Sequence, residues 1–559
     1  MTGPDQKPAV LLSAAVLIAA GVLVYWNSFQ GAFVFDDIRA IVNNPHIRQV
    51  FPLGQSLTGP WDSTVRDRPV ASFTLALNYA LDGLRPRGYH AFNLAVHILA
   101  GLALFGILRR TFSNQILPPP VNRSADGLAL AASLLWLVHP LQTESVTYII
   151  QRSESLAGLF YLLTLYCFIR GTSSPVRRCW LGASILFCAL GMGTKSMMIT
   201  APLIVLAYDA VFTSRSLKNA LKKHWAVFLA LGSTWTIQLL IISRTSYADL
   251  KGLSPTAYFI TEPGVITHLI RLAFWPYPLC LDYGWPLSQS IGRILPPALF
   301  IGGLLWATVW ALIKQPTLGF AGVWFFLTLA PTSSILPLED PVFEHRIYLP
   351  LAAIATLVVV GTCNLIRRIQ SKKNRRMISL SFALGAVLIL GFLTMKRNEL
   401  YRDPLALWRE IAALRPEHAR GHYNYGLELS KAGLSAEAIE EYREAVRLKP
   451  DYADAYNNLG AALADQGDFI QAINYYGRAV RARPDFWVAR FNMGMAFNRL
   501  GKHREAEICF REVTRIRPGY APAFYQTAES LREQGKAEEA KAYYHQALQL
   551  NPEPAPDAF

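Results

Sequence analysis

The chain has 559 residues, of which 52% are hydrophobic and only 17% are charged. Its formal net charge of +15 would suggest a nucleic-acid partner in a soluble protein. Here the basic residues stand between long apolar segments, as topology signals do, so the composition argues against a nucleic-acid binder. The six cysteines form no CxxC pair, so neither a zinc site nor a disulfide framework is expected.

Apolar segments fill the chain up to about residue 396. Each has roughly the 17–25 residues that a helix needs to cross a bilayer. The sequence predicts eleven spans, near residues 9–26, 90–108, 127–142, 146–169, 179–194, 197–213, 224–243, 296–313, 318–336, 347–366 and 377–395. A further segment, 264–280, is short and broken by Pro276 and Pro278, so we expect it to be re-entrant or interfacial. Residues 1–396 are therefore predicted to form a multi-spanning membrane domain.

Basic residues mark one side of this predicted bundle. They follow the even-numbered spans, as at Arg109 and Arg110, at Arg177 and Arg178, and across residues 367–376. By the positive-inside rule, that side is the cytoplasm. Eleven spans then place the C-terminal part on the opposite side, which is a periplasm or a lumen. Residues 264–280 belong to this outer side, because another full crossing would put 367–376 outside.

Residues 397–559 carry an internal repeat. Prolines recur every 34 residues, at Pro416, Pro450, Pro484, Pro518 and Pro552, and this is the tetratricopeptide period. Glycine, alanine and aromatic residues keep the same step, so small residues allow paired helices to approach and the aromatic ring fills the groove between them. We predict a half-repeat at 403–416 and four repeats over 417–552. The whole fold is then all-α, a membrane bundle followed by an α-solenoid that binds a protein or peptide.

Ionisable residues gather at the outer ends of the predicted spans, where each is costly to place beside lipid. They are Asp36, Asp37, Arg68, His90, His139, Glu144, Arg152, Glu154, Lys195, Asp282, Glu344, His345 and Arg346. A carboxylate can act as general base on a hydroxyl, and cations can stabilise a departing lipid phosphate. Each residue alone has a structural explanation: Asp36 and Asp37 could cap a helix, and Arg152 could pair with Glu154. Together they favour a site.

Several stretches of the sequence resemble one family. They are FVFDDIRAIVNNPHIR, RPVASFTLALNYALDGLRPRGYHAFNLAVH, HPLQTESVTYIIQRSE, LAFWPYPLCLDYGWP and EHRIYLPLA. Together with the 34-residue repeats, they resemble the transmembrane, tetratricopeptide-repeat O-mannosyltransferases and their bacterial relatives. The resemblance implies a multi-spanning glycosyltransferase of the C-type fold that uses polyprenyl-phosphate sugars.

The resemblance also implies roles for particular residues. An acidic pair in the first outer loop carries the catalytic base or binds a divalent metal in this fold class, and it maps onto Asp36 and Asp37, with Asp36 preferred as base. Basic residues of later outer loops contact the donor phosphate. This maps onto Arg346 first, with His345, Lys195 and Arg152 as further candidates. The chain departs from the expected pattern at Ser196, where an acidic residue should follow the lysine.

We therefore expect an inverting transferase that moves a sugar from a lipid phosphate to Ser or Thr hydroxyls of an acceptor protein bound by the repeats. Two alternatives remain. One is a non-enzymatic membrane-anchored repeat scaffold, which needs no paired acids outside. The other is a lipid-linked oligosaccharide ligase or polymerase, which differs only in donor size. The short loops and the C-terminal sequence favour a bacterial inner-membrane protein with a periplasmic site and periplasmic repeats, or lumenal repeats if the protein is eukaryotic.

Overall fold

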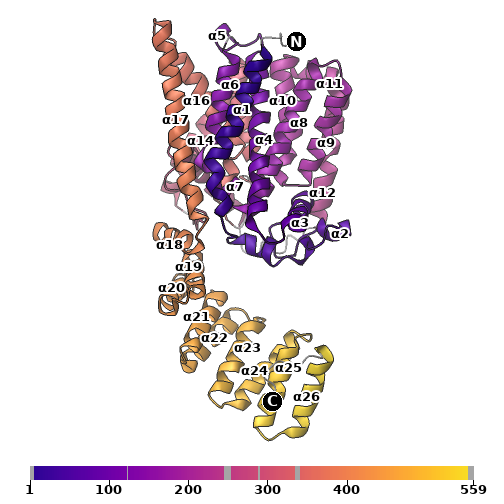
Figure 1. Cartoon of the computed structure of the whole chain (residues 1–559), viewed down its shortest axis with the longest axis vertical. Coiled ribbons are helices and arrows are strands. Elements are labelled where there is room, and N and C mark those ends of the chain that lie inside the picture. Colours follow the sequence, from indigo (N-terminus) through magenta and orange to yellow (C-terminus); the bar gives the residue numbers. More distant parts are fainter. Residues whose placement is uncertain (1–5, 123, 245–253, 288–289, 334–339, 552–559) are drawn as a thin grey trace. The chain divides into compact units, whose positions relative to one another are not determined.

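The computed structural model describes residues 6–122, 124–244, 254–287, 290–333 and 340–551. These residues form helices joined by turns and loops, and this described part contains no strand, which confirms the all-α class. The chain divides into two compact units (Figure 1). The membrane unit comprises Met1–Leu281 and Trp285–Pro404, and the repeat unit comprises Asp282–Gly284 and Leu405–Phe559.

The membrane unit has a helix at the position of every predicted span (Figure 1). In the described ranges, seven helices are long and apolar enough to cross a membrane, and three shorter apolar helices accompany them. Positions 334–336 of the predicted ninth span lie outside the described residues. The helices at the predicted spans are α1 (Gln6–Tyr25), α4 (Pro86–Phe112), α6 (Ala125–Leu137), α8 (Arg152–Ser173), α9 (Arg177–Met192), α10 (Ala201–Tyr208), α11 (Leu217–Ser233), α12 (Trp235–Arg244), α14 (Ile291–Lys314), α15 (Pro316–Leu329), α16 (Pro350–Ile366) and α17 (Lys372–Leu400).

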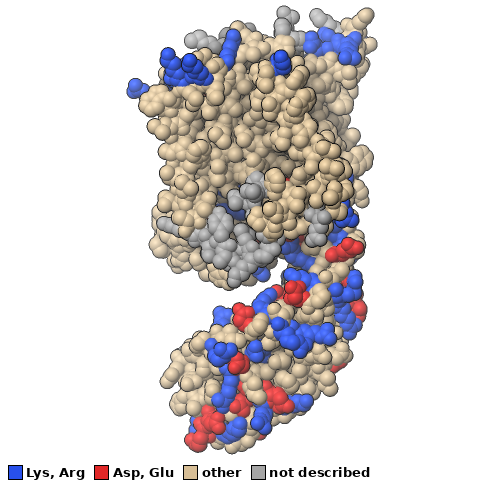
Figure 2. Space-filling view, turned by 180° about the vertical axis from the view of Figure 1, so that it is seen from behind, with Lys and Arg blue, Asp and Glu red and all other residues tan. Residues whose placement is uncertain are grey.

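Local sequence explains where several of these helices begin. Pro86, Pro316 and Pro350 occupy the first positions of α4, α15 and α16, where proline's missing N–H sacrifices no helical hydrogen bond. Ser371 caps α17 by accepting a hydrogen bond from the Asn374 backbone N–H at 3.3 Å. Figure 2 shows Lys and Arg side chains gathered at the upper end of the membrane unit, above a lateral surface dominated by uncharged residues. This surface suits contact with lipid, and the basic end matches the clusters found in the sequence.

Helix α13 (Pro255–Phe274) covers most of the segment that was expected to be re-entrant or interfacial. At its start, the Tyr258 hydroxyl donates to the Thr332 carbonyl, just after α15, at 2.9 Å. At its end, the Ala273 carbonyl lies 3.1 Å from Nε2 of His139, just after α6. Both contacts lie at the end of the bundle opposite its basic end, so α13 runs along this end and does not cross the bundle.

Aromatic side chains follow α13. Phe274, Trp275 and Tyr277 are 63%, 68% and 69% exposed, which is unusual for such large apolar rings in water but typical of a membrane interface. The amphipathic rings of Trp and Tyr are favoured at the level of lipid head groups. The position of α13 and these rings therefore supports an interfacial segment.

Buried polar contacts join several of the apolar helices. His97 on α4 places Nδ1 at 2.9 Å from the Tyr348 hydroxyl and Nε2 at 2.9 Å from the Leu137 carbonyl. The Trp136 indole donates to the Tyr348 carbonyl at 2.7 Å. These side chains are buried, and buried polar groups stabilise a structure only when they are hydrogen-bonded. The contacts fix α4, α6 and the start of α16 against one another.

The repeat unit is a tetratricopeptide-repeat α-solenoid. A single helix, α18 (Pro404–Leu414), precedes four helix pairs. The pairs are α19 (Ala419–Lys431) with α20 (Ser435–Leu448), α21 (Ala453–Asp465) with α22 (Phe469–Ala482), α23 (Trp487–Arg499) with α24 (His503–Ile516), and α25 (Ala521–Glu533) with α26 (Ala537–Leu550). Gly433, Gly467, Gly501 and Gly535 link the two helices of each pair with positive φ of 72–85°, a conformation that glycine adopts without strain. Pro552, the last proline of the period, lies outside the described residues.

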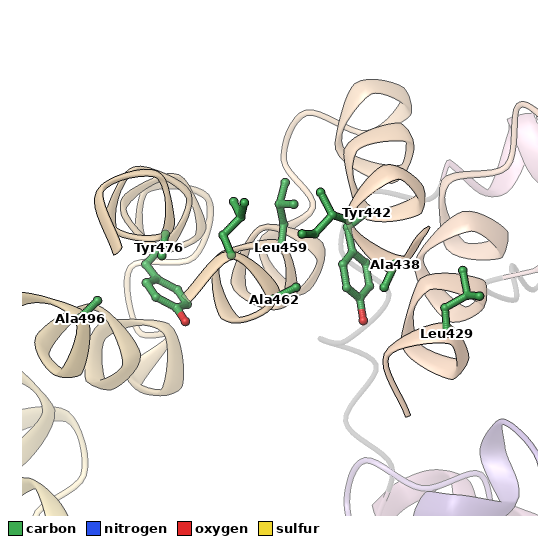
Figure 3. Packing of buried hydrophobic residues seen from close by; sticks show 10 residues of the cluster. Leu429, Ala438, Tyr442, Leu459, Ala462, Tyr476 and Ala496 are labelled. Atoms are coloured by element: carbon green, nitrogen blue, oxygen red, sulfur yellow. The ribbon is translucent and has the colours of Figure 1, made fainter. Parts of the chain in front are cut away.

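A second series of glycines, Gly426, Gly460 and Gly494, explains the close approach of the paired helices. A Cβ atom at Gly460 would lie 2.8 Å from the Tyr476 ring, and the same holds for Gly426 and Tyr442. These rings belong to a continuous core that runs from repeat to repeat (Figure 3). The 34-residue period therefore records a physical register in which each glycine receives one aromatic ring.

Candidate active site

The loop after α1 holds the acidic pair in two different environments. None of the Asp37 surface is exposed. Its carboxylate accepts hydrogen bonds from the backbone N–H groups of Val34, at 3.0 Å, and Ile150, at 2.8 Å. Burial raises the pKa of Asp37 to about 8, although these two hydrogen bonds lower it in part. Both oxygens of Asp37 are thus occupied by backbone N–H groups, and Asp37 serves to tie this loop to the start of α8.

Asp36 is half-buried. The preceding residue, Phe35, has a positive φ of 47°, and such strain in a non-glycine residue is often found at functional sites. The backbone N–H of Asp36 donates to the Tyr148 hydroxyl at 3.0 Å. The backbone of Asp36 is thus fixed on one side by Tyr148 and on the other by the buried Asp37, which favours Asp36 as the carboxylate that a substrate can reach.

Arg152 and His90 hold the loops together. The Arg152 guanidinium is buried and stacks over the Phe92 ring, 4.3 Å from its centroid. It donates to Oδ1 of Asn93 and to the backbone carbonyls of Thr74 and Tyr89, at distances of 2.8, 3.1 and 3.2 Å. His90 is buried with Nε2 3.3 Å from the Gly31 carbonyl, and a Cβ atom at position 31 would lie only 2.7 Å from that nitrogen. Both residues therefore act as connections between elements in this structure.

A second group of charges lies at the start of α8. Lys195 Nζ is 2.6 Å from Glu154 Oε2, and both side chains are buried. Arg68, at the start of α3 (Pro69–Asp82), donates to the Ser153 hydroxyl at 2.8 Å. Arg68 is half-buried, and its electrostatic neighbours include Glu154 and Asp36. The structure therefore places Arg68, for which the resemblance implied no individual role, within electrostatic reach of both Asp36 and Glu154.

A buried pair, Glu144 and His345, joins the short helix α7 (Thr143–Val146) to the loop before α16. Glu144 accepts a hydrogen bond from the His345 backbone N–H at 2.8 Å and lies 2.7 Å from Nδ1 of the same histidine. Burial raises the pKa of Glu144 to about 7. Burial also lowers the pKa of His345, and the positive charges of Lys195, Arg346 and Arg68 lower it further. Three cations from three loops thus act on one imidazole, which places them in a common electrostatic environment.

Arg346 and Glu344 flank His345. Arg346 is buried, and its guanidinium donates to four protein oxygens, namely the Tyr258 hydroxyl and the carbonyls of Thr332, Asp340 and Pro341. It also lies 3.7 Å from Glu262 of α13, a residue that the sequence analysis missed because it is a lone charge beside Pro263. Glu344 accepts a hydrogen bond from the Cys280 backbone N–H at 2.6 Å. Arg346 therefore fixes α13 and the loop after α15, and its role toward a donor phosphate stays a prediction.

Two further predicted residues make other contacts. His139 accepts a hydrogen bond from the Leu141 backbone N–H and contacts the end of α13, as described above. Asp282 belongs to the repeat unit, where Arg420 donates to both of its carboxylate oxygens at 2.6 and 2.7 Å and His418 lies at 2.9 Å. Burial alone would raise the pKa of Asp282, but the hydrogen bonds from His418 and Arg420 lower it well below its usual range.

Among the described residues, no three His, Cys, Asp or Glu side chains are grouped as ligands for a metal ion. Asp36 and Asp37, the predicted candidates, do not share one environment, because the Asp37 oxygens face backbone N–H groups. The chemistry that this arrangement offers is that of one accessible carboxylate beside several cations. Such a set can accept a proton and stabilise a developing negative charge.

The fold and this site define a class, that of multi-spanning membrane proteins with a tetratricopeptide-repeat array and an ionisable site at the loop end of the bundle. Three family models match the repeat unit. The model described as "TPR repeat" matches residues 431–467, and two described as "Tetratricopeptide repeat" match residues 451–519 and 521–554.

The chain is similar to proteins named protein O-mannosyl-transferase. It is 29% identical to TMTC4 of Mus musculus over 75% of this chain, and 27% identical to TMTC1 of Homo sapiens and to F38B6.6 of Caenorhabditis elegans, each over 76% of this chain. These alignments cover 64%, 54% and 61% of the three relatives. The chain therefore spans between about half and two thirds of the length of the relatives that it matches. The resemblance to the transmembrane, tetratricopeptide-repeat O-mannosyltransferases is confirmed.

Two solved structures match part of the chain. A crystal structure of MamA is 23% identical, with a TM-score of 0.26, and the match covers 26% of this chain and 86% of MamA. YrrB, described as a TPR protein with an unusual peptide-binding site, is 27% identical, with a TM-score of 0.26, over 30% of this chain and 84% of its own.

Proposed function

We propose that this protein is a membrane glycosyltransferase that moves a sugar from a polyprenyl-phosphate donor to Ser or Thr hydroxyls of an acceptor protein bound by the repeats. The observation that carries the proposal is the half-buried Asp36 beside Arg68, at the loop end of a membrane bundle. Its support is the similarity, over three quarters of the chain, to proteins named O-mannosyl-transferases. The repeats supply a surface of the kind that binds proteins or peptides.

In the proposed reaction, Asp36 accepts the proton of the acceptor hydroxyl. The hydroxyl oxygen attacks the anomeric carbon from the face opposite the phosphate, and the bond between that carbon and the phosphate oxygen breaks. The electron pair of this bond goes to the polyprenyl phosphate, and the configuration of the sugar is inverted. Nearby cations stabilise the charge that develops on the leaving phosphate, which is the largest contribution that a prearranged site can make.

We assign the loop end of the bundle and the repeats to the outer side of the membrane, which is the periplasm of a bacterial inner membrane, or the lumen if the protein is eukaryotic. The support is the charge distribution, because Lys and Arg gather at the other end of the membrane unit (Figure 2) and such residues favour the cytoplasm. A lipid-linked donor would then present its head group to the loops that carry Asp36.

The test is transfer by purified full-length protein, given a labelled polyprenyl-phosphate sugar and a peptide rich in Ser and Thr. Asp36→Asn should lower the rate of transfer about 100-fold to 10,000-fold, which is the usual contribution of a general base. Asp62→Asn is the matched control, because Asp62 is an exposed aspartate of the same loop. The control should transfer at the wild-type rate.

Two results would overturn the proposal in different ways. Equal transfer by Asp36→Asn and wild type would exclude Asp36 as base. A lack of transfer by the wild type with any polyprenyl-phosphate monosaccharide would leave the scaffold and the ligase. Transfer from a lipid-linked oligosaccharide in place of a monosaccharide would identify the ligase.

A further inference from the structure

The outer loops bring several cations together, and their hydrogen bonds divide them into two kinds. Arg152 and Arg346 are buried, and each donates to at least three protein oxygens from other elements. A guanidinium has only five N–H donors. These two residues are thus largely committed to the protein, and a ligand would have to displace structural contacts to reach them.

Arg68 and Lys195 are different. Arg68 donates to the Ser153 hydroxyl, which is a neutral and buried acceptor, and Arg68 is only half-buried. Lys195 pairs with Glu154, the next residue of α8. Two cations from distant loops therefore converge on two consecutive residues in the first turn of a helix that has 22 residues. The positive end of that helix also favours an anion.

One anion is already present at this position, and it belongs to the protein. The Glu154 side chain is 3% exposed and the Lys195 side chain 8% exposed. Burying such a pair has a desolvation cost that its own attraction does not always offset. Burial lowers the pKa of Lys195, and the charge of Glu154 raises it in part. Glu154 therefore offsets part of the effect of burial on Lys195, at a place where Arg68 adds a second positive charge.

We propose that Arg68 and Lys195 form the binding site for the phosphate of the lipid donor, and that the Glu154 carboxylate occupies this site when no donor is bound. The inference rests on the proposed function and adds to it the residues that hold the leaving group. Arg68, as the half-buried member, meets the phosphate first, and Lys195 is released from Glu154 to bind it.

The charge of the leaving group explains why such a site would favour reaction. The donor phosphate is a diester with about one negative charge, whereas the departing monoester carries about 1.5 to 2 because its second pKa is about 6. The cations therefore bind the product, and the transition state that resembles it, more strongly than the donor. Return of the Glu154 carboxylate then helps to expel the polyprenyl phosphate, because it competes for the same cations.

The experiment measures binding of the product, polyprenyl phosphate, to purified full-length protein, so that it needs neither acceptor nor transfer. Wild type should bind polyprenyl phosphate at least 10-fold more tightly than the matching polyprenol. Arg68→Gln should weaken binding of the phosphate about 10-fold or more, because a charge-assisted contact is lost. Arg68→Lys should restore part of it. The matched control is Arg85→Gln, since the Arg85 side chain is 83% exposed, and it should bind as wild type does.

The direction in which Glu154→Gln changes the affinity for polyprenyl phosphate distinguishes two roles for this carboxylate. A competing carboxylate predicts that this variant binds polyprenyl phosphate several-fold more tightly, whereas a carboxylate that merely orients Lys195 predicts weaker binding. Weaker binding by Glu154→Gln, or unchanged binding by Arg68→Gln, would overturn the inference. Arg68→Gln leaves the Lys195–Glu154 pair intact. If Glu154→Gln does not fold, the binding of polyprenyl phosphate by Arg68→Gln alone tests the proposed phosphate site.

Two further comparisons separate the possible outcomes. Inorganic phosphate that competes at the same concentration as the lipid would assign the site to a free anion in place of a lipid donor. Normal binding of polyprenyl phosphate together with undiminished transfer by Asp36→Asn would overturn the proposed base and retain this site. Loss of transfer in Asp36→Asn, with no effect of Arg68→Gln on binding, would retain the proposed base and overturn the phosphate site.

Discussion

Asp37 offers a test of the structure that does not depend on catalysis. Its carboxyl group is fully buried and accepts two backbone N–H groups. In Asp37→Asn, the amide oxygen can still accept one of them, but the amide nitrogen faces the other. A buried donor left without an acceptor costs about 1–3 kcal/mol. At acidic pH we therefore expect the variant to be less stable than wild type by about this amount.

The difference should change with pH in a defined direction. Burial raises the pKa of Asp37 from 3.8 in the unfolded chain to about 8 in the folded protein. Between these values the folded protein binds more protons than the unfolded chain, so the wild type loses stability as pH rises. Each pH unit is worth about 1.4 kcal/mol, so that wild type should lose about 3 kcal/mol from this group between pH 5 and pH 7. Asp37→Asn lacks this group and should lose none of it.

The assay is the thermal midpoint of unfolding of the full-length protein in detergent, at pH 5, 6, 7 and 8. Asp37→Asn should melt below wild type at pH 5 and approach or exceed it at pH 7. Asp62→Asn, which changes an exposed aspartate of the same loop, should follow wild type throughout. Parallel curves for wild type and Asp37→Asn over this range would refute the buried, proton-holding carboxyl group.

Two further predictions concern the repeats and the topology. Gly494→Ala should destabilise α23 and α24 by about 1–3 kcal/mol, because its Cβ would lie 2.7 Å from the Phe510 ring. Gly477→Ala, whose Cβ meets nothing within 4 Å, should stabilise its helix by about 0.5–1 kcal/mol. Hydrogen exchange in the full-length protein would report both changes, and equal protection in the two variants would contradict the packing of each glycine against one aromatic ring. In a background without native cysteines, Ile470→Cys should react with a membrane-impermeant reagent in intact cells and Arg375→Cys should not, and the reverse pattern would invert the proposed topology.

The fold was largely predictable because its two units have strong periodic signals. The 34-residue spacing reflects the contact of each glycine with one aromatic ring, as at Gly460 and Tyr476, and that contact is local in sequence. The membrane helices follow from apolar length alone. Helix α13 was harder to predict, because Pro263 and Glu262 interrupt its apolar pattern. Its position also depends on contacts with Thr332 and His139, which are distant in the sequence.

The site was predictable in location but not in detail. The sequence indicated that ionisable residues gather at one end of the bundle, because they recur at the ends of apolar segments. It favoured Asp36 over Asp37 as base but carried no signal for their different environments, since only the fold brings the Ile150 N–H to Asp37. Likewise, nothing local distinguishes Arg152 from Arg68, and their difference comes from how many protein oxygens surround each guanidinium. Asp282 joins the repeat unit through Arg420, a contact that joins residues 138 positions apart.

The ring-on-glycine register also bears on how such a chain can change in evolution. Each helix pair contacts mainly the pair before and the pair after it, so that the array is assembled from interchangeable segments. Duplication of residues 453–486 would insert one further segment whose ends meet the same neighbours as before. The length of the array can thus vary in steps of 34 residues while every buried contact of the membrane unit stays the same, and the reach toward the proposed acceptor can evolve separately from the residues that we propose to carry the chemistry.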